Sequence, residues 1–97
     1  METEKKRLEW ARPAQAAYEG PIARIAIDDI HTASLVAGRV ARSLALLQVH
    51  PQLGTPSGLV GRRTYPIPNT GHNLTYRVTR EAIWILRWYR QRQNVPR

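Results

Sequence analysis

The chain contains no cysteine, and Lys5 and Lys6 are its only lysines. Without cysteine, neither a disulfide framework nor a thiolate metal site can supplement the hydrophobic core. A chain of 97 residues buries only about 60–65% of the surface that it exposes when unfolded, so this core is thin. We expect one compact domain over residues 1–97, located in the cytoplasm.

Long apolar runs are also absent. No stretch approaches the roughly 18 apolar residues that a membrane-spanning helix requires. The first residues, METEKKR, lead into Leu8 without the apolar segment of a signal peptide. We therefore expect a protein that has no membrane partner.

Acidic residues are scarce in the second half of the chain. Residues 1–50 carry seven basic and six acidic side chains, whereas residues 51–97 carry eight arginines against Glu81 alone. The two halves therefore contribute +1 and +7 to the net charge of +8. Arginine presents a planar fork that matches phosphate or carboxylate, so the pattern predicts a polyanionic partner. A generally arginine-rich surface, the simpler explanation, would not favour one half so strongly.

Residue types that support catalysis or metal binding are few. The three histidines, His31, His50 and His72, are too scattered for a metal-ligand spacing. The two aspartates are adjacent, at 28–29, and belong to a helix end instead of forming a separated pair. We expect no metal and no cofactor.

The N-terminal half has the periodicity of a strand followed by two helices. Residues 7–11 alternate between polar and apolar, which predicts a short strand. Apolar residues in 14–30 recur at spacings of three to five, and the Gly-Pro pair at 20–21 predicts two helical pieces or one bent helix. Thr32 is placed to cap a second helix that runs to about His50. The short connection predicts an antiparallel helical hairpin.

The second helix has a clear apolar stripe. Val36, Val40, Leu44 and Leu47 recur at i, i+4, i+8 and i+11, which places them on one face. We expect this face to pack into the core.

The C-terminal half alternates loop and strand signals. Residues 51–61 are rich in proline, glycine, serine and threonine, which indicates a loop. Residues 63–67 predict an edge strand, because Pro66 cannot donate to a ladder. Residues 73–79 alternate cleanly, and residues 82–89 form a nearly continuous apolar run that predicts a central strand covered on both faces.

Two strand positions bear on the core. Trp84 and Trp88 lie four apart, which predicts that both pack on one strand face in the core. Tyr76 alternates with Leu74, so we expect it in the core with its hydroxyl at an edge. Arg77 then lies on the opposite face of the same strand.

Four segments together resemble the RelE/ParE family of bacterial toxins, over Leu8 to Pro96. They are residues 44–54 (LALLQVHPQLG), 61–67 (GRRTYPI), 74–78 (LTYRV), and 85–87 (ILR) followed by 92–93 (RQ). They are similar to the family's helix end and following corner, to two of its strands, and to its terminal strand. Each segment alone is weak evidence of the family. The resemblance rests on the order and spacing of all four.

The resemblance implies an α+β fold. Its N-terminal strand and helical hairpin precede a three-stranded antiparallel meander, with the hairpin packed on one face of a curved sheet. It also implies an acidic antitoxin whose partly disordered segment folds onto the toxin, in a toxin–antitoxin hetero-oligomer. We expect residues 91–97 to form a flexible tail.

The resemblance leaves two activities open, because one fold hosts both. ParE-like members inhibit DNA gyrase and are not enzymes, whereas RelE-like members cut messenger RNA on the ribosome without a metal. The helical hairpin favours the ParE-like activity. A third alternative is a generic nucleic-acid-binding module, although an exposed basic helix or exposed sheet aromatics are not evident.

The candidate site residues follow from the same alternatives. For a nuclease, the catalytic candidates are Arg63, Arg77, Arg87, Tyr89 and Arg90. Arg90 stands where many family members have a histidine, and arginine is a poor general base. For contact with the target or the antitoxin, the candidates are Arg63, Arg77, Arg87, Trp88, Tyr89, Arg90 and Arg92. We expect the positive charge after Pro51 to lie together on one face of the sheet.

Overall fold

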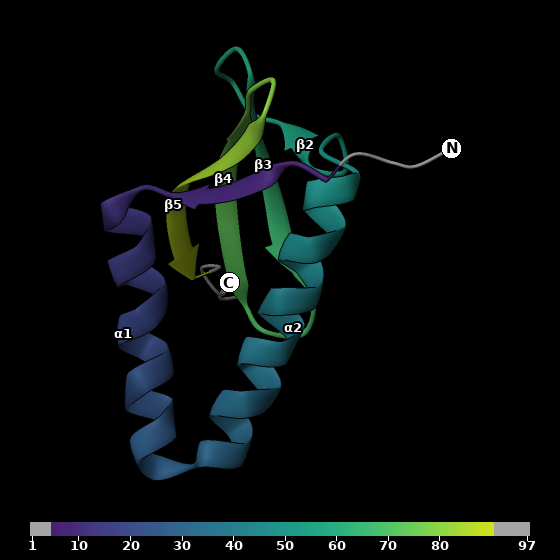
Figure 1. Ribbon diagram of the computed structural model, residues 1–97. Coiled ribbons are helices and arrows are strands. Elements are labelled where there is room, and N and C mark those ends of the chain that lie inside the picture. The colour runs from purple at the N-terminus through teal and green to yellow at the C-terminus, as the bar shows by residue number, and fades with distance from the viewer. Residues whose placement is uncertain (1–4, 91–97) are drawn as a thin grey trace, which may run out of the picture.

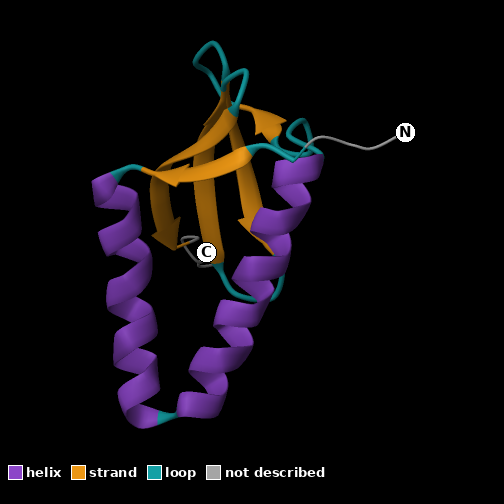
Figure 2. Ribbon diagram, viewed as in Figure 1, coloured by secondary structure: helices purple, strands orange, loops and turns teal. Residues whose placement is uncertain are grey.

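Two helices pack against one five-stranded sheet (Figures 1 and 2). The structure is a computed structural model that describes residues 5–90. The predicted tail, residues 91–97, and with it Arg92, lies outside the described residues. The elements are β1 (Arg7–Trp10), α1 (Arg12–Asp28), α2 (Ile30–Val49), β2 (Thr55–Pro56), β3 (Arg62–Ile67), β4 (His72–Val78) and β5 (Ala82–Arg90).

The sheet confirms the predicted α+β class. Its order is β1-β5-β4-β3-β2; β1 runs parallel to β5, and the other neighbours are antiparallel. The two-residue strand β2 was not predicted, because proline and threonine in a loop segment give no strand periodicity. β5 lies between β1 and β4, so the middle strand of the sheet is β4 and not β5 as predicted. Pro66 lies on β3 beyond the two residues that pair with β2, at the open edge where proline is tolerated.

The helices form the predicted hairpin on one face of the sheet. They meet at their short connection and diverge toward the sheet, and the closed end of the hairpin extends past the strands (Figure 1). The residue that caps α2 is Asp29, not Thr32 as predicted. Asp29 Oδ1 accepts hydrogen bonds from the amides of His31 at 3.0 Å and Thr32 at 3.3 Å. The Thr32 hydroxyl also donates to Asp29, and these bonds lower the pKa of the Asp29 carboxyl.

Helix α1 is one element, although Pro21 lies inside it. Proline removes one backbone hydrogen bond and crowds the preceding turn, which is why two pieces were an alternative. The helix contacts both α2 and β5. Tertiary contacts of this kind stabilise a helix against the cost of an internal proline.

The predicted stripe of α2 forms the helical side of the core. Val40, Leu44 and Leu47 are buried, and Val36 packs against them partly exposed. The sheet contributes Ile67, Leu74, Tyr76, Ile83, Ile85 and Trp88 to the same cluster. The 3.6-residue helical period therefore predicted the core face correctly. Neither helix in the described part of the chain is long and apolar enough to cross a membrane.

A bulge in β5 separates the two tryptophans of that strand. Thr75 pairs with Arg87 and Tyr76 pairs with Ile85, so Leu86 is an extra residue. The extra residue shifts the alternation, and Trp88 falls on the face that Ile85 occupies. Trp88 is 5% exposed and Trp84 is 38% exposed. The prediction that both tryptophans share one core face is therefore wrong, and so is the prediction that β5 is covered on both faces.

Candidate functional site on the open sheet face

Strand register places three arginines on the sheet face opposite the helices. Residues paired across neighbouring strands point to the same face. Arg62 pairs with Arg77, and Arg77 pairs with Trp84. One rung along, Thr64 pairs with Thr75, and Thr75 with Arg87. We call this surface the open face; its members are Arg62, Thr64, Pro66, Asn73, Thr75, Arg77, Trp84, Arg87 and Tyr89, together with Glu9 of β1, which pairs with Trp84.

The arginines of the open face have no acidic partner among residues 5–90. In this described part of the chain, the salt bridges are those of Arg7, whose guanidinium binds Glu9 at 3.2 Å and Glu81 at 3.3 Å. Arg62 and Arg77 stand directly opposite each other on adjacent strands. Like charges at such positions destabilise a sheet. An anionic ligand bound between the two guanidinium groups would offset this repulsion. The face is therefore suited to bind an anion.

Two aromatic side chains stand among these arginines. Trp84 is 38% exposed and Tyr89 is 37% exposed. The Arg87 guanidinium carbon lies 5.4 Å from the centre of the Tyr89 ring, a cation–π contact that holds both side chains together. The open face thus combines cations with flat aromatic surfaces.

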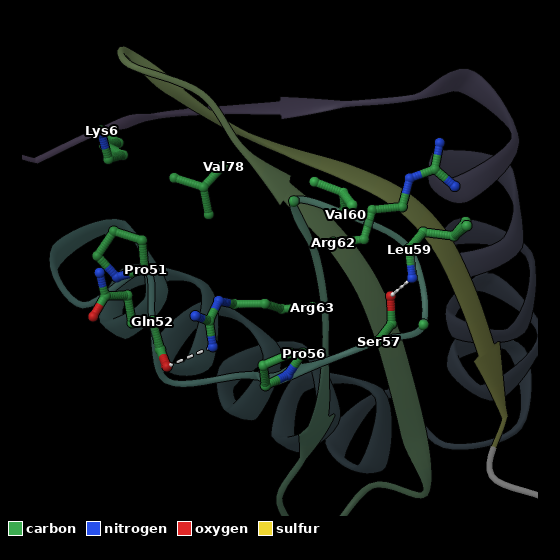
Figure 3. Close-up of a pocket in the computed structure, with 12 residues that line it drawn as sticks. Lys6, Pro51, Gln52, Pro56, Ser57, Leu59, Val60, Arg62, Arg63 and Val78 are labelled. Carbon is green, nitrogen blue, oxygen red and sulfur yellow. Dashed lines mark hydrogen bonds between the residues drawn. The ribbon is translucent and has the colours of Figure 1, made fainter.

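Arg63, the neighbour of Arg62 in β3, points elsewhere. Its Nη1 donates to the carbonyl oxygens of Gly54 at 2.6 Å and Gln52 at 3.2 Å. Figure 3 shows this side chain directed toward Gln52, while Arg62 points away from it. A hollow of about 580 Å³ lies beside them, between the 51–61 loop and Lys6. Because its carbonyl bonds hold the guanidinium in place, Arg63 fixes the loop that follows α2.

A second bond network ties the same loop to the sheet. The buried Tyr76 hydroxyl donates to the Pro51 carbonyl at 2.6 Å and accepts from the Gly54 amide at 2.9 Å. A Cβ on Gly54 would lie 2.6 Å from that hydroxyl and 2.7 Å from the Thr64 carbonyl, so only glycine fits there. Burial raises the pKa of Tyr76. Because it is buried and bonded to two backbone groups, its hydroxyl is a structural group.

His72 and Trp88 form a buried pair on the helix-covered face. The Trp88 indole N–H donates to His72 Nδ1 at 3.1 Å. Trp88 also packs against Trp10 and Tyr18, with ring centres 5.4 Å and 4.9 Å away. Burial lowers the pKa of His72, and the nearby Arg90 charge lowers it further. His72 is thus a neutral acceptor that holds the aromatic cluster, and not a group over the open face.

The structure divides the predicted site residues between two faces. Arg77, Arg87 and Tyr89 lie together on the open face, as expected. Arg63 and Arg90 share the helix-covered face by register, so the positive charge after Pro51 is not all on one face. Trp88 is buried and offers no contact surface, because the bulge turns it inward.

Two members of the open face were missed as site residues. Arg62 stands directly beside the candidate Arg63, and the register with β4 shows that Arg62 is the one on the open face. Trp84 was assigned to the core. One sequence signal existed: strict alternation through Ile83 and Ile85 would bury Arg87, and a bulge is the ordinary way to avoid that.

The open face can bind but offers little for acid–base catalysis. Among its described residues the polar groups are those of arginine, threonine, tyrosine and Asn73, and the one carboxylate, Glu9 on β1, is bonded to Arg7 at 3.2 Å. Arginine stays protonated at every physiological pH. In residues 5–90 no group of three or more histidine, aspartate, glutamate or cysteine side chains is placed to hold a metal ion. The arrangement fits recognition of an anionic or aromatic surface through several arginines.

The fold with its basic sheet face is the α+β arrangement that the sequence motifs predicted. The chain is similar to a solved structure described as the chromosomal ParDE TA system from P. aeruginosa, with a TM-score of 0.72 and 24% sequence identity. The match covers 89% of this chain and 96% of that chain. The likeness shows that the two chains share a fold. No protein-family model matches the chain, and no curated protein matches it in sequence.

Proposed function

We propose that this chain is the toxin component of a type II toxin–antitoxin system, that it inhibits DNA gyrase, and that a cognate acidic antitoxin neutralises it. The observation that carries the proposal is the shared fold. It spans 89% of this chain, and the similar structure is described as a ParDE toxin–antitoxin system. The net charge of +8 fits an acidic antitoxin.

The composition of the open face supports gyrase inhibition over RNA cleavage. A metal-independent ribonuclease needs a base for the 2′-hydroxyl and an acid for the leaving oxygen. Arg77 and Arg87 serve neither role well, the Glu9 carboxylate is bonded to Arg7, and His72 is buried against Trp88. A toxin that acts by holding its target needs only a contact surface. On this proposal the chain is not an enzyme, and Arg62, Arg77, Trp84, Arg87 and Tyr89 form that surface.

Controlled expression in a bacterium tests the proposal. Growth, gyrase supercoiling and message cleavage in a translating extract are measured in parallel. Arrested growth with lost supercoiling and intact messages is expected. Cleaved messages with normal supercoiling would instead assign the RelE-like endonuclease activity, with the ribosome and mRNA as partners. Normal growth at verified expression would contradict the toxin assignment.

The double variant Arg77→Ala/Arg87→Ala locates the surface. Both side chains are exposed, so the variant should remain folded and lose most of its toxicity. Arg39→Ala/Arg42→Ala removes the same charge from helix α2 and is the matched control. Equal loss of toxicity in both variants would mean that only net charge matters.

A second candidate function rests on one observation. The exposed rings of Trp84 and Tyr89 among arginines resemble a stacking platform for single-stranded nucleic acid. Affinity for an oligonucleotide would then fall steeply with salt, by about 0.7 log unit per phosphate contact for each tenfold rise. Weak binding of the oligonucleotide that does not depend on salt in this way would contradict the nucleic-acid-binding function.

A further inference from the structure

Helix α2 carries a second stripe beside its buried one. Leu35, Arg39, Arg42, Leu46 and Val49 follow one another at spacings of four, three, four and three residues. Leu53 continues the spacing just past the helix end, and we call these six residues the α2 seam. Alternating spacings of four and three are those by which one helix presents a single line of side chains to another helix.

The seam is apolar at its ends and exposed. Leu35 is 59% exposed, Leu46 is 45% exposed and Leu53 is 47% exposed. Isolated exposed leucines are ordinary on protein surfaces, but Leu35 and Leu46 share one line on α2, and Leu53 lies past the helix end beside the same hollow as Leu46. Leucines at this spacing form the contact line of a helix–helix interface.

The surface along the seam is hollowed. Leu46 lines three hollows: one of about 310 Å³ shared with Arg39 and Tyr65, and two of about 530 Å³ shared with Val49. One of the larger two reaches Leu53, and the other reaches Arg42. The hollows therefore follow the second half of the seam from β3 to the corner after α2. Side chains of a docked element have space to enter there.

The middle of the seam is positively charged. Arg39 Nη1 donates to the Asn69 carbonyl at 3.0 Å, which fixes the guanidinium beside the helix. Arg42 Nη1 lies 3.8 Å from where a Cβ on Gly38 would be, so this guanidinium lies back along the helix surface. Neither arginine forms a salt bridge within residues 5–90. The seam thus presents two adjacent cations between apolar ends.

We propose that the α2 seam binds an acidic amphipathic helix. Two carboxylates in the middle of that helix pair with Arg39 and Arg42, and apolar side chains on both flanks enter the hollows around Leu46 and cover Leu35. Helix docking through such anchors is a common mode of recognition. This inference rests on the proposed function in one respect, because the antitoxin is then the source of the helix.

The charges favour this occupant over a second copy of the chain. Two parallel seams would place Arg39 against Arg39 and Arg42 against Arg42. Two antiparallel seams that overlap fully over the helical residues 35–49 would place Arg42 against Arg42 and Arg39 beside Leu46, which opposes like charges and buries a charge without a partner. A helix with carboxylates at those positions removes both penalties.

Binding of a synthetic peptide tests the proposal. The probe is a labelled peptide of about three heptads, with leucine at the seam-facing positions except two central glutamates. Outward-facing Glu–Lys pairs at i,i+4 keep it helical. Fluorescence anisotropy should show binding to the full chain. A second peptide with lysines in place of the two glutamates should bind at least on the order of 100-fold more weakly, since opposed charge pairs become repulsive.

Charge reversal on the protein supplies the decisive comparison. The variant Arg39→Glu/Arg42→Glu should no longer bind the glutamate peptide and should instead bind the lysine peptide. Arg77→Glu/Arg87→Glu makes the same change of net charge on the open face, and at physiological salt it should alter the affinity less than about threefold. Leu46→Glu should abolish binding, whereas Leu59→Glu, at another exposed leucine in the 51–61 loop, should not.

Three results would overturn the inference: no binding of the glutamate peptide, equal effects of both charge reversals, or full affinity of Leu46→Glu. A dimer of the chain that Leu46→Glu converts to a monomer would assign the seam to a second copy. Growth arrest separates this inference from the proposed function. If the chain is toxic but does not bind the peptide, only the inference is contradicted. If the chain binds the peptide but is not toxic, only the proposed function is contradicted.

Discussion

The two faces of the sheet treat their polar side chains in opposite ways. On the helix-covered face, Tyr76, Arg63 and His72 all have partners within the chain, at 2.6 to 3.2 Å. On the open face, Arg62 and Arg77 oppose each other with no carboxylate bonded to either in residues 5–90. The covered face uses its polar groups to stabilise the fold. The open face leaves its charges available and gives up some stability to do so.

This difference separates stability from function along single strands. In β3, Arg63 belongs to the fold and Arg62 to the surface; in β5, Trp88 belongs to the fold and Trp84 to the surface. The same substitution should therefore change stability very differently at two residues of the same type on one strand. The following predictions compare such pairs, in order of decreasing effect.

The largest contrast is between the two tryptophans of β5. Trp88→Ala removes a buried indole and should lower the free energy of unfolding by about 3–5 kcal/mol. Trp84→Ala removes a partly exposed ring and should cost about 1 kcal/mol or less. Urea unfolding followed by circular dichroism measures both. If Trp88→Ala does not fold, Trp88→Phe supplies a milder comparison, and equal losses for the two tryptophans would show that the bulge at Leu86 is misplaced.

The tryptophan pair also marks the limit of sequence-based prediction here. Element order and the buried stripe through Val40 and Leu44 follow from periodicity, which is a local property of the chain. The bulge at Leu86 depends on pairing with β4, and the cap at Asp29 depends on where the connection closes. These depend on contacts between segments, and alternation alone cannot fix them.

The candidate site was predictable to the same extent. Strand alternation predicts the outward position of Arg77, whereas Arg87 and Tyr89 reach the open face only because of the bulge at Leu86. Arg62 and Arg63 are adjacent, and only the register with β4 tells which one faces outward. A one-residue shift exchanges the two faces, so a charge count along the chain cannot assign them.

The next contrast is between two tyrosines. Tyr76→Phe leaves the Gly54 amide and the Pro51 carbonyl without their partner, in a buried place, and should cost about 1–3 kcal/mol. Tyr89→Phe removes a hydroxyl from an exposed ring and should change stability by less than about 0.5 kcal/mol. Thermal or urea unfolding of both variants measures the difference. Equal stabilities of the two variants would show that the hydrogen bonds of the Tyr76 hydroxyl do not stabilise the fold.

A smaller effect depends on pH. His72 accepts a hydrogen bond from Trp88 only while Nδ1 is unprotonated, and burial together with Arg90 lowers its pKa in the folded state. The unfolded chain, with a histidine pKa of about 6.5, takes up the proton more readily. Stability should therefore be fully present above about pH 6.5 and fall as the pH decreases further.

Unfolding measured across this range tests the histidine assignment. His72→Asn keeps an acceptor near Nδ1 without a titrating group, so its stability should vary less between about pH 7 and pH 5. The pH dependence of the parent chain should exceed that of the variant. Identical profiles would mean that other groups cause the acid sensitivity.

The smallest effect has the opposite sign. Arg77→Thr removes one of the two like charges paired across β3 and β4, and threonine suits a strand. The variant should be more stable than the parent by about 0.2–1 kcal/mol at low salt, the range for cross-strand pairs. Arg62→Thr should do the same, and the double variant should gain less than the sum, because the repulsion is removed only once.

Salt shows whether repulsion causes that gain. Exposed charges are screened within about 3 Å at 1 M salt, so the parent and Arg77→Thr should converge in stability there. A gain in stability that persists in high salt would come from strand propensity alone. Repulsion between Arg62 and Arg77 would then not destabilise the sheet. The same variant should lose toxicity, since Arg77 lies in the proposed contact surface. Gain in stability together with loss of activity is the signature of residues kept for binding and not for folding.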